Sequence, residues 1–341
     1  NTIDTANGKL AKDNQITQLT ADQAFMAIAT QGEKFIENVS KFATAKNIES
    51  VQSAITEANG KLAEGNKISQ LTADQAFMAI AAHGESFVTN MKLATGDNIK
   101  SVQNTIDTAN GKLAEGNKIS QLTADQVFMT IATQGQKFLT NVKLATGESI
   151  KSVQNTIDTA NKGLEAGNKL TQLSADQVFM MVASEGKTFL DNMKLVTADN
   201  IKGVQDHIDG LNKENPGDQI AVLNADQVFM GIASKGNEFL TNIKIATTEN
   251  FQKVQDDIMN ANETLGGDNQ LTQLSNQQIF NAVLAQGQTF MDNVSKVATA
   301  ENIEEVQRII TSNNGELAAT DQLTLLTADQ VFMALATQGE K

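Results

Sequence analysis

The sequence contains no cysteine, tryptophan or tyrosine, and its 341 residues include two histidines and one proline. Without cysteine there are no disulfides, thiolate metal sites or cysteine nucleophiles, and His83 and His207 fall at unrelated positions, so no imidazole recurs for general-base or zinc chemistry. A lone proline leaves little to interrupt helices, and the missing tryptophan and tyrosine remove side chains on which nucleic-acid bases stack. These absences argue against an enzyme and against a nucleic-acid-binding protein.

Charge and hydropathy restrict the possible partners further. The chain carries 40 acidic and 26 basic residues, for a net charge of -14, and an acidic surface repels nucleic acids and anionic membranes. No run approaches the roughly 18 consecutive apolar residues of a membrane span. Acidic residues in predicted loops, such as Glu115 and Asp218, lack the alternating oxygen donors and closing Glu of a calcium loop. We expect no catalytic residue, no cofactor, no metal, no nucleic-acid partner and no membrane span.

One sequence pattern of about 51 residues recurs along the chain. Two phrases mark the pattern, LTADQxFM and VQxxI. The isoleucine of VQxxI recurs in step with LTADQxFM. A fixed period of this length is typical of repeat architectures. The phenylalanine of LTADQxFM stands at Phe25, Phe77, Phe128, Phe179, Phe229, Phe280 and Phe332.

The period predicts one array of nearly seven repeats over residues 1–341. The pattern is interrupted at both ends, and the helix expected after Thr327 is cut at Lys341 with its apolar stripe open. Repeat arrays normally close with polar capping units, so we expect further copies on both sides in a longer parent protein. The approximate repeats are 1–19 (partial), 20–71, 72–122, 123–173, 174–223, 224–274, 275–326 and 327–341 (partial).

Each repeat opens with a helix-capping signal. In the copy 123–173, the Thr123 hydroxyl can accept from the amide of Gln126, and the Gln126 side chain can return to the Thr123 amide. Asp125 in the first turn meets the positive end of the helix dipole. Capping therefore explains these recurring polar residues without a catalytic role. The same box is Thr20 to Gln23, Thr72 to Gln75, Ser174 to Gln177, Asn224 to Gln227, Ser275 to Gln278 and Thr327 to Gln330.

An apolar stripe with helical spacing follows the cap and passes through a recurrent glycine. Because the phase survives that glycine, we predict one continuous helix of about 22 residues, with the bare glycine allowing a neighbouring helix to pack closely. The alternative is that the glycine ends a first helix in a left-handed cap. The stripe in one copy is Phe128, Ile131, Gly135, Phe138, Val142 and Ala145. The close-packing positions are Gly32, Gly84, Gly135, Gly186, Gly236 and Gly287.

A further helix begins after Thr146 and carries apolar residues from Ile150 to Leu164 at spacings of three and four. It is expected to end at an Asn-Gly signal such as Asn110-Gly111, before a loop of about ten residues. Neither helix can bury its stripe alone, and stacking of successive helical hairpins would bury both. The predicted fold class is therefore all-α: tandem helical-hairpin repeats that form an α-solenoid or a helical rod. The equivalent capping residues are Thr44, Thr95, Thr197, Thr247 and Thr299.

The segment from Phe138 to Val153, FLTNVKLATGESIKSV, resembles the second and third helices of the three-helix albumin-binding modules of Gram-positive surface proteins. The resemblance covers about half of a repeat and departs from that family where the family usually places aromatic residues. It implies an alternative architecture, a string of three-helix modules in which each recurrent glycine breaks a helix.

An asparagine recurs inside the long predicted helix in all six complete copies. Asn is unfavourable in a helix interior, so its return indicates a gain elsewhere. We predict a row of Asn amides that hydrogen-bond from repeat to repeat and set the register, as one buried Asn does in a coiled coil. The alternative is a solvent-facing Asn retained from recent duplication. The positions are Asn38, Asn90, Asn141, Asn192, Asn242 and Asn293.

Phenylalanine and methionine are the large apolar side chains of the repeat. Thirteen of the 15 Phe occupy two recurrent positions, and Met follows the first of them in six of seven copies. We predict that both share or flank the core, because few other large side chains could fill it. The alternative is an aromatic and Met row that lines a groove for an apolar ligand or partner helix.

The uniformity of the copies favours a structural role. A contact that works between two copies works along the whole length, so head-to-tail or lateral self-association is favoured. We therefore expect a self-associating segment of a long, bacterial surface or extracellular protein: a stalk, fibre or adhesive filament. The alternative is a monomeric α-solenoid scaffold that binds a peptide, protein or apolar ligand. Such scaffolds usually vary the residues of the binding face from copy to copy, whereas these copies are nearly uniform. Absence of cysteine suits an exported protein and equally suits a cytoplasmic one.

Overall fold

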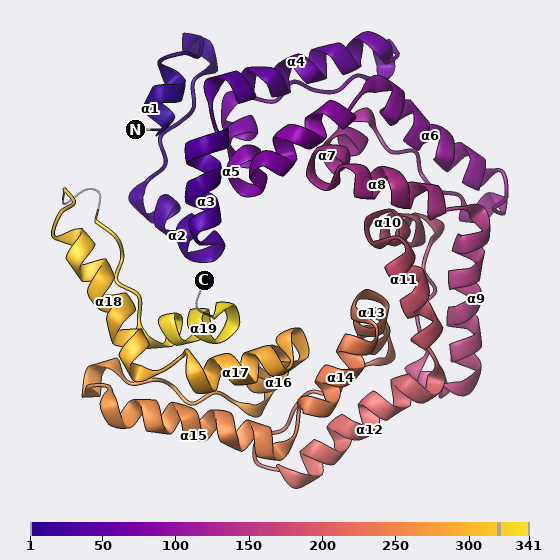
Figure 1. Ribbon diagram of the computed structural model, residues 1–341. Helices are drawn as coiled ribbons and strands as arrows, with labels where there is room; N and C mark the ends of the chain where they lie inside the picture. The colour runs from indigo at the N-terminus through magenta and orange to yellow at the C-terminus, as the bar shows by residue number, and fades with distance from the viewer. Residues whose placement is uncertain (1, 319–321, 340–341) are drawn as a thin grey trace. The chain divides into compact units, whose positions relative to one another are not determined.

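The computed structural model describes residues 2–318 and 322–339, and of residue 268 the backbone alone. Within these residues all regular secondary structure is helical, with 19 α-helices and no β-strand (Figure 1). This confirms the predicted all-α class. None of the described helices is both long and apolar enough to cross a membrane. Outside the described part lie the first residue of the chain, three residues of the copy 275–326 and the last two residues of the partial copy 327–341.

A first helix opens each copy directly after the capping residue. Its apolar residues recur every three or four positions, which places them on one face. These helices are α2 (Ala21–Gln31), α5 (Ala73–Asn90), α7 (Ala124–Gln134), α10 (Ala175–Glu185), α13 (Ala225–Lys235), α16 (Asn276–Gln286) and α19 (Ala328–Gln338). The element α5 contains the first and second helices of its copy, with a break at Gly84.

A short second helix follows the recurrent glycine. These helices are α3 (Glu33–Glu37), α8 (Gln136–Asn141), α11 (Lys187–Asn192), α14 (Asn237–Ile245) and α17 (Gln288–Lys296). In four copies a tighter or wider turn continues the second helix. Three of these turns are 3-10 helices, η4 (Met91–Leu93), η6 (Val142–Leu144) and η8 (Met193–Leu195), and the fourth, η2 (Asn38–Phe42), is a π-helix.

A third helix completes the copy and precedes the loop. These helices are α1 (Thr2–Asn7), α4 (Ala45–Lys61), α6 (Gly96–Asn110), α9 (Gly147–Gly163), α12 (Ala198–Glu214), α15 (Thr248–Thr264) and α18 (Ala300–Asn314). The loops carry single 3-10 turns, η1 (Lys12–Asn14), η3 (Glu64–Asn66), η5 (Glu115–Asn117), η7 (Ala166–Asn168) and η9 (Gly267–Asn269).

The predicted continuous helix of about 22 residues is wrong, because every recurrent glycine breaks it. Gly135 has φ 59° and ψ -135°, a region that glycine alone occupies readily, and its N–H closes the last turn on the carbonyl of Ile131. All seven recurrent glycines have positive φ. The apolar phase survives the break because the helices on both sides bury residues in the same core. Periodicity alone therefore could not reveal the break.

The predicted caps are confirmed at both kinds of long helix. At the first helices, the side chain of the capping residue accepts from the backbone N–H of the Gln three residues on. The side chain of that Gln accepts in return from the backbone N–H of the capping residue. Both bonds are present in all seven copies. At the third helices, Thr146 accepts from the amide of Ser149, and the five equivalent threonines each accept from an Asn amide three residues on.

The phenylalanines form the core, as predicted, and the methionines that follow them do not. Of the thirteen recurrent Phe, twelve are buried and Phe25 is half-buried. Met26, Met78, Met180 and Met230 are exposed, so at these positions Met flanks the core and does not share it. The first Phe faces the neighbouring helices, which turns the next residue, about 100° further round the helix, toward solvent.

The described chain divides into two compact parts, each with its own core. The first part comprises residues up to 155 together with 173–190, and the second comprises 156–172 together with residues from 191 onward. In the first part, α4 and α6 follow one another along one edge and α5 and α7 lie beside them (Figure 1). In the second part, α12 and α15 take the same relation to the shorter helices α13, α14, α16 and α17 (Figure 1).

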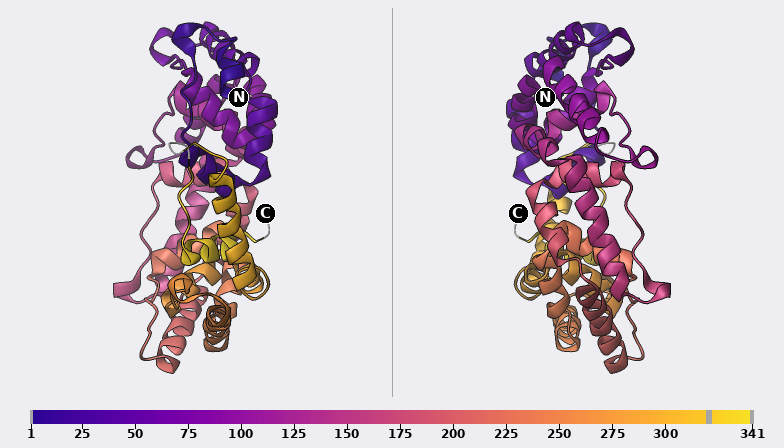
Figure 2. Two further views of the ribbon diagram at one scale, coloured as in Figure 1. Left: turned by 90° about the vertical axis from the view of Figure 1, so that its left-hand side faces the viewer. Right: turned by 90° about the vertical axis from the view of Figure 1, so that its right-hand side faces the viewer.

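An asparagine at the end of each third helix holds the following loop, which Figure 2 shows as extended chain beside the helices. The Asn110 Nδ2 donates to the Ile119 carbonyl at 2.8 Å, and its Oδ1 accepts from the Ile119 N–H at 2.7 Å. The sequence identified such residues as stop signals and did not reveal the pairing. Other instances with both bonds are Asn7 with Ile16, Asn59 with Ile68, Asn161 with Leu170, Asn212 with Ile220, Asn262 with Leu271 and Asn314 with Leu323.

Replacement of a capping residue tests the local cause of these helices. Thr123→Ala removes the acceptor for the Gln126 amide and should lower the free energy of unfolding by about 1 kcal/mol. Thr130→Ala is the matched control, since Thr130 bonds within the helix interior to the Gln126 carbonyl. Urea unfolding followed by circular dichroism measures both. Equal effects of the two substitutions would contradict the capping role.

Candidate functional site: contacts between consecutive copies

One contact joins the second helix of each copy to the first helix of the next. In the first compact part, the Asn90 Nδ2 donates to the Ala132 carbonyl at 3.2 Å. The Asn90 Oδ1 lies so close to Gly135 that a Cβ on that glycine would be less than 3.0 Å from it. The Asn amide therefore sits where any other residue at 135 would carry its side chain. We call this contact the Asn–Gly joint.

The joint recurs six times, three times in each compact part. The donor is always the recurrent Asn, and the acceptor is a backbone carbonyl two or three residues before the next recurrent glycine. The bonds are Asn38 to Ala81, Asn90 to Ala132, Asn141 to Ser184, Asn192 to Ala233, Asn242 to Leu284 and Asn293 to Ala336, at 3.0 to 3.2 Å.

The recurrent Asn side chains therefore do not bond to one another at these joints, which corrects the predicted row of Asn amides. Asn38, Asn141 and Asn242 are buried, and the other three are half-buried, so the solvent-facing alternative does not describe them either. A carbonyl near a helix C-terminus lacks a partner within its own helix, and the Asn supplies one. Sequence spacing located the asparagine but could not identify a backbone partner.

The recurrent glycines allow close approach, but of a side chain and not of a neighbouring helix backbone. At Gly84, Gly186, Gly236 and Gly287, a Cβ would also lie less than 3.0 Å from the preceding Asn Oδ1. At Gly339 the corresponding distance is 3.3 Å, so the last joint is looser. Gly32 has the same positive φ as the others. Backbone conformation and space thus independently require glycine at Gly84, Gly135, Gly186, Gly236 and Gly287.

The loop of one copy contacts the third helix of the next copy through a pair of amides. The Asn66 Nδ2 donates to the Gln103 Oε1 at 3.0 Å, and the Gln103 Nε2 returns to the Asn66 Oδ1 and also donates to the Leu122 carbonyl at 2.9 Å. Sequence analysis did not single out either residue. Reciprocal pairs also join Asn14 to Gln52, Asn117 to Gln154, Asn168 to Gln205 and Asn269 to Gln307.

The same loop also binds the start of the first helix two copies further on. The Ser69 N–H and hydroxyl both donate to the Asp125 carboxylate, at 2.6 and 3.1 Å. Asp125 was attributed to the helix dipole alone, and the structure gives it this second role. The same two-bond contact joins Thr17 to Asp74, Ser120 to Asp176, Thr171 to Asp226 and Thr272 to Asp329.

In one instance of this contact both partners are replaced together. Ala221 stands where the other loops have Ser or Thr, and it retains the backbone donor alone. Gln277 stands where the other helices have Asp, and its Oε1 accepts from the Ala221 N–H at 2.6 Å. A neutral amide therefore replaces the carboxylate where the hydroxyl donor is lost. The paired change indicates that the contact is maintained as a unit.

Glycine also adjusts the contact between consecutive third helices. A Cβ on Gly147, at the start of α9, would lie 2.7 Å from the Lys112 Cβ and 2.8 Å from the Ala109 carbonyl oxygen. At the next such contact the glycine lies at the end of the earlier helix and not at the start of the later one. A Cβ on Gly163, at the end of α9, would lie 2.6 Å from the Cβ of Ala198, at the start of α12. One member of each of these pairs is glycine, which lets the helix ends approach.

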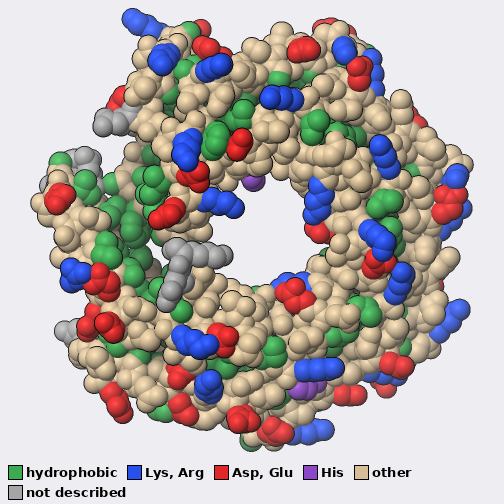
Figure 3. Space-filling model, in the orientation of Figure 1, with side chains coloured by type: hydrophobic (Ala, Val, Ile, Leu, Met, Phe, Trp, Pro, Cys, Tyr) green, Lys and Arg blue, Asp and Glu red, His purple; other side chains and the backbone are tan. Residues whose placement is uncertain are grey.

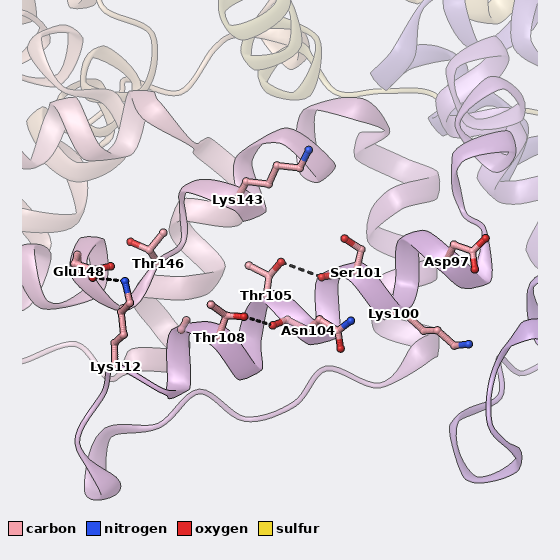
Figure 4. Close-up of a pocket in the computed structure, with 12 residues that line it drawn as sticks. Asp97, Lys100, Ser101, Asn104, Thr105, Thr108, Lys112, Lys143, Thr146 and Glu148 are labelled. Carbon is pink, nitrogen blue, oxygen red and sulfur yellow. Dashed lines mark hydrogen bonds and ion pairs between the residues drawn. The ribbon is translucent and has the colours of Figure 1, made fainter.

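A polar groove of about 590 Å³ flanks α6 and the start of α9 in the first compact part (Figure 4). Across it, Lys112 forms an ion pair with Glu148, and the hydrogen bond from its ammonium lowers the pKa of that carboxyl. The Thr105 and Thr108 hydroxyls donate to the carbonyls of Ser101 and Asn104 within their own helix.

An equivalent ion pair links α4 to α6. The hydrogen bond from Lys61 lowers the pKa of Asp97, and the Lys61 pKa is raised by the same contact. Both pairs are largely exposed, so their contribution to stability is small. On the face drawn in Figure 3, charged side chains are scattered singly or in pairs, and hydrophobic side chains form small separate patches.

Among the described residues, no group of three or more acidic or imidazole side chains is arranged to hold a metal ion. The His207 Nε2 lies 2.8 Å from the Ala246 carbonyl, and the His83 ring stacks near Phe87 at 6.5 Å between centroids. Each histidine thus has a local structural contact. Comparison of the chain with protein families, with curated proteins and with solved structures found no match.

A glycine substitution tests the Asn–Gly joint. Gly135→Ala places a methyl group on the Asn90 amide and forces φ 59° on an L-residue, so we expect the free energy of unfolding to fall by about 2–4 kcal/mol. Gly116→Ala is the control, because no atom lies within 4 Å of its added Cβ, and it should change stability by less than about 0.5 kcal/mol.

A double variant separates the two causes at this joint. Removal of the amide by Asn90→Ala should reduce the cost of Gly135→Ala by about 1–2 kcal/mol, because the clash disappears while the backbone strain remains. Urea unfolding of the wild-type chain, the two single variants and the double variant gives the interaction energy between the two residues. Additive effects would show that Asn90 and Gly135 do not interact.

The natural pair Ala221 and Gln277 predicts compensation at an equivalent contact. Ser69→Ala and Asp125→Gln should each destabilise the chain by about 1 kcal/mol, and the double variant by about 0.5–1 kcal/mol less than their sum. The double variant recreates the contact of the copy 174–223 with the copy 275–326. Thermal unfolding measures the cycle, and a double variant worse than the sum would contradict the account.

Proposed function

We propose that the chain is a structural, self-associating segment of a long, bacterial surface or extracellular protein, in which stacked copies form an α-solenoid or helical rod that serves as a stalk, fibre or adhesive filament. The observation that carries this proposal is the recurrence of the Asn–Gly joint at all six places where a described copy meets the next. Interchangeable joints let an array gain length without any new type of contact.

The register role of the recurrent Asn belongs to the same proposal. An Asn that bonds one particular carbonyl and fills the space above one particular glycine allows a single alignment of two copies, because a shift along the helix would bring a side chain against the amide. Asn38 and Asn141, which are buried, would lose their partner in any other alignment. The Asn thus specifies the stacking distance, and the glycine specifies where the Asn fits.

Self-association is proposed through the exposed methionines of the first helices. Met26, Met78 and Met180 occupy the same position in three copies of the first compact part and are 53%, 48% and 42% exposed. Met is a flexible apolar side chain that adapts to varied partner surfaces. Its repetition on a uniform surface fits a second copy of the same chain, which would meet it with the same spacing.

Negative-stain electron microscopy with sedimentation velocity across a concentration series tests the proposal. We expect long filaments of uniform width, with larger species increasing with concentration. The variant Met26→Gln, Met78→Gln, Met180→Gln should remain monomeric, since the apolar contact is lost while the joints are untouched. The control Met259→Gln, Ile309→Gln replaces exposed apolar residues at non-recurrent positions and should still assemble.

Single particles at every concentration would contradict self-association. That result would favour the alternative, a monomeric scaffold that binds a peptide, protein or apolar ligand. Assembly that persists in the methionine variant would retain the structural role but reject the methionines as the contact between chains.

A further inference from the structure

The copy 224–274 has an apolar cavity beside the first helix of the next copy. In the second compact part, a cavity of about 640 Å³ opens between α13, α14 and α16. Leu223, Met230, Phe239 and Leu284 are the large apolar side chains of its lining. The volume lies within the roughly 300–1,000 Å³ of typical small-ligand sites.

Glycine at position 231 shapes this cavity. The Phe239 ring covers Gly231 so closely that a Cβ on the glycine would lie less than 3.0 Å from the ring carbon Cε2. The ring could not take this position above a larger residue, and both residues line the cavity. No other copy has glycine here: the equivalents are Ala27, Ala79, Thr130, Met181, Ala282 and Ala334.

A second departure in the same copy brings a positive charge to the cavity. The Lys235 ammonium donates to the Ala285 carbonyl, so it bridges from α13 to α16 across the lining. An ammonium has three donors, and this contact uses one. Glu238 forms an ion pair with this ammonium at 3.9 Å, a distance longer than a hydrogen bond. No other copy has a lysine here: the equivalents are Gln31, His83, Gln134, Glu185, Gln286 and Gln338.

The acidic and amide groups of the lining are already engaged. The Asp226 carboxylate accepts the N–H and the hydroxyl of Thr171 on its two oxygens. Asn224 and Gln227 bond one another in the capping box. Lys235 therefore determines the charge preference of the cavity, and apolar side chains determine the rest.

We propose that this cavity binds a free, single-chain anionic amphiphile, an alkyl carboxylate, with the alkyl chain against Met230, Phe239 and Leu284 and the carboxylate on the Lys235 ammonium. An apolar wall with one charged group at its edge matches a ligand that is apolar over most of its length and anionic at one end. This ligand site is independent of self-association and goes beyond the structural role.

Nuclear magnetic resonance of the full chain with ¹³C-methyl methionine tests the site, with dodecanoate below its micelle concentration as the probe. The Met230→Leu variant assigns the Met230 methyl signal. We expect a saturable shift of Met230 and unchanged signals from Met78 and Met180, which lie in other copies. Dodecan-1-ol, which lacks the charge, should bind about five- to tenfold more weakly than dodecanoate.

Two variants restore residues that other copies use. Lys235→Gln should abolish the preference for dodecanoate over dodecan-1-ol, and Gly231→Ala should weaken both by about tenfold, because the methyl group and the displaced Phe239 ring take up cavity space. Gln134→Lys is the matched control, since it adds the lysine to a copy with Thr130 in place of glycine, and it should create no new site.

Three results would overturn the proposal. Equal shifts at Met78, Met180 and Met230 would indicate adsorption to exposed methionine, and equal binding of the acid and the alcohol would remove the role of Lys235. Cosedimentation with phosphatidylglycerol vesicles without a dodecanoate shift at Met230 would assign the surface to a membrane lipid. Because Gly231→Ala leaves Met26, Met78 and Met180 in place, loss of ligand binding and loss of filaments can be observed separately.

Discussion

The contact between an asparagine amide and a glycine without a side chain is the constraint on which the stacking of copies depends. A short second helix presents the Asn, and the first helix of the next copy offers the Ala132 carbonyl and, at Gly135, room for the Asn amide where a side chain would otherwise lie. The Asn amide needs the carbonyl as a hydrogen-bond partner because the amide is removed from water. Glycine is needed at its position because the chain turns there with a positive φ. Loop contacts add further links between copies, since Asn66 bonds to Gln103 in the next copy and Ser69 bonds to Asp125 in the copy after that.

The sequence predicted the helical elements well because their causes are local. Thr123 and Gln126 cap a helix through atoms three residues apart, and the spacing from Phe128 to Ile131 follows from the helix itself. The break at Gly135 was missed because two helices that share one core preserve the apolar phase across it. The partner of Asn90 was missed for another reason: it is a backbone carbonyl in another copy, and a backbone atom leaves no residue signature. The alternative of three helices per copy, implied by the resemblance to albumin-binding modules, describes the helix count better, yet the joints connect successive copies and do not leave them as separate modules.

Repetition also makes the exceptions informative. Where one member of a contact changes within this chain, the other often changes with it, as Ala221 does with Gln277 and Gly163 with Ala198. These paired changes preserve a contact between copies. Gly231 and Lys235 form a different kind of exception, because they preserve no joint and instead open and charge a cavity. The proposed ligand site and the proposed structural role are therefore compatible, because Gly231 and Lys235 take no part in the Asn–Gly joints.

Native-state hydrogen exchange of the wild-type chain and of Asn141→Ala tests most directly whether the joint couples one copy to the next. Asn141 donates to Ser184, and Gly186 lies against its amide, so both partners belong to the first compact part. The account predicts that the variant loses protection in residues 175–190, the first helix and glycine turn of the following copy, as well as near residue 141. Faster exchange confined to residues 136–145, with 175–190 unchanged, would contradict it.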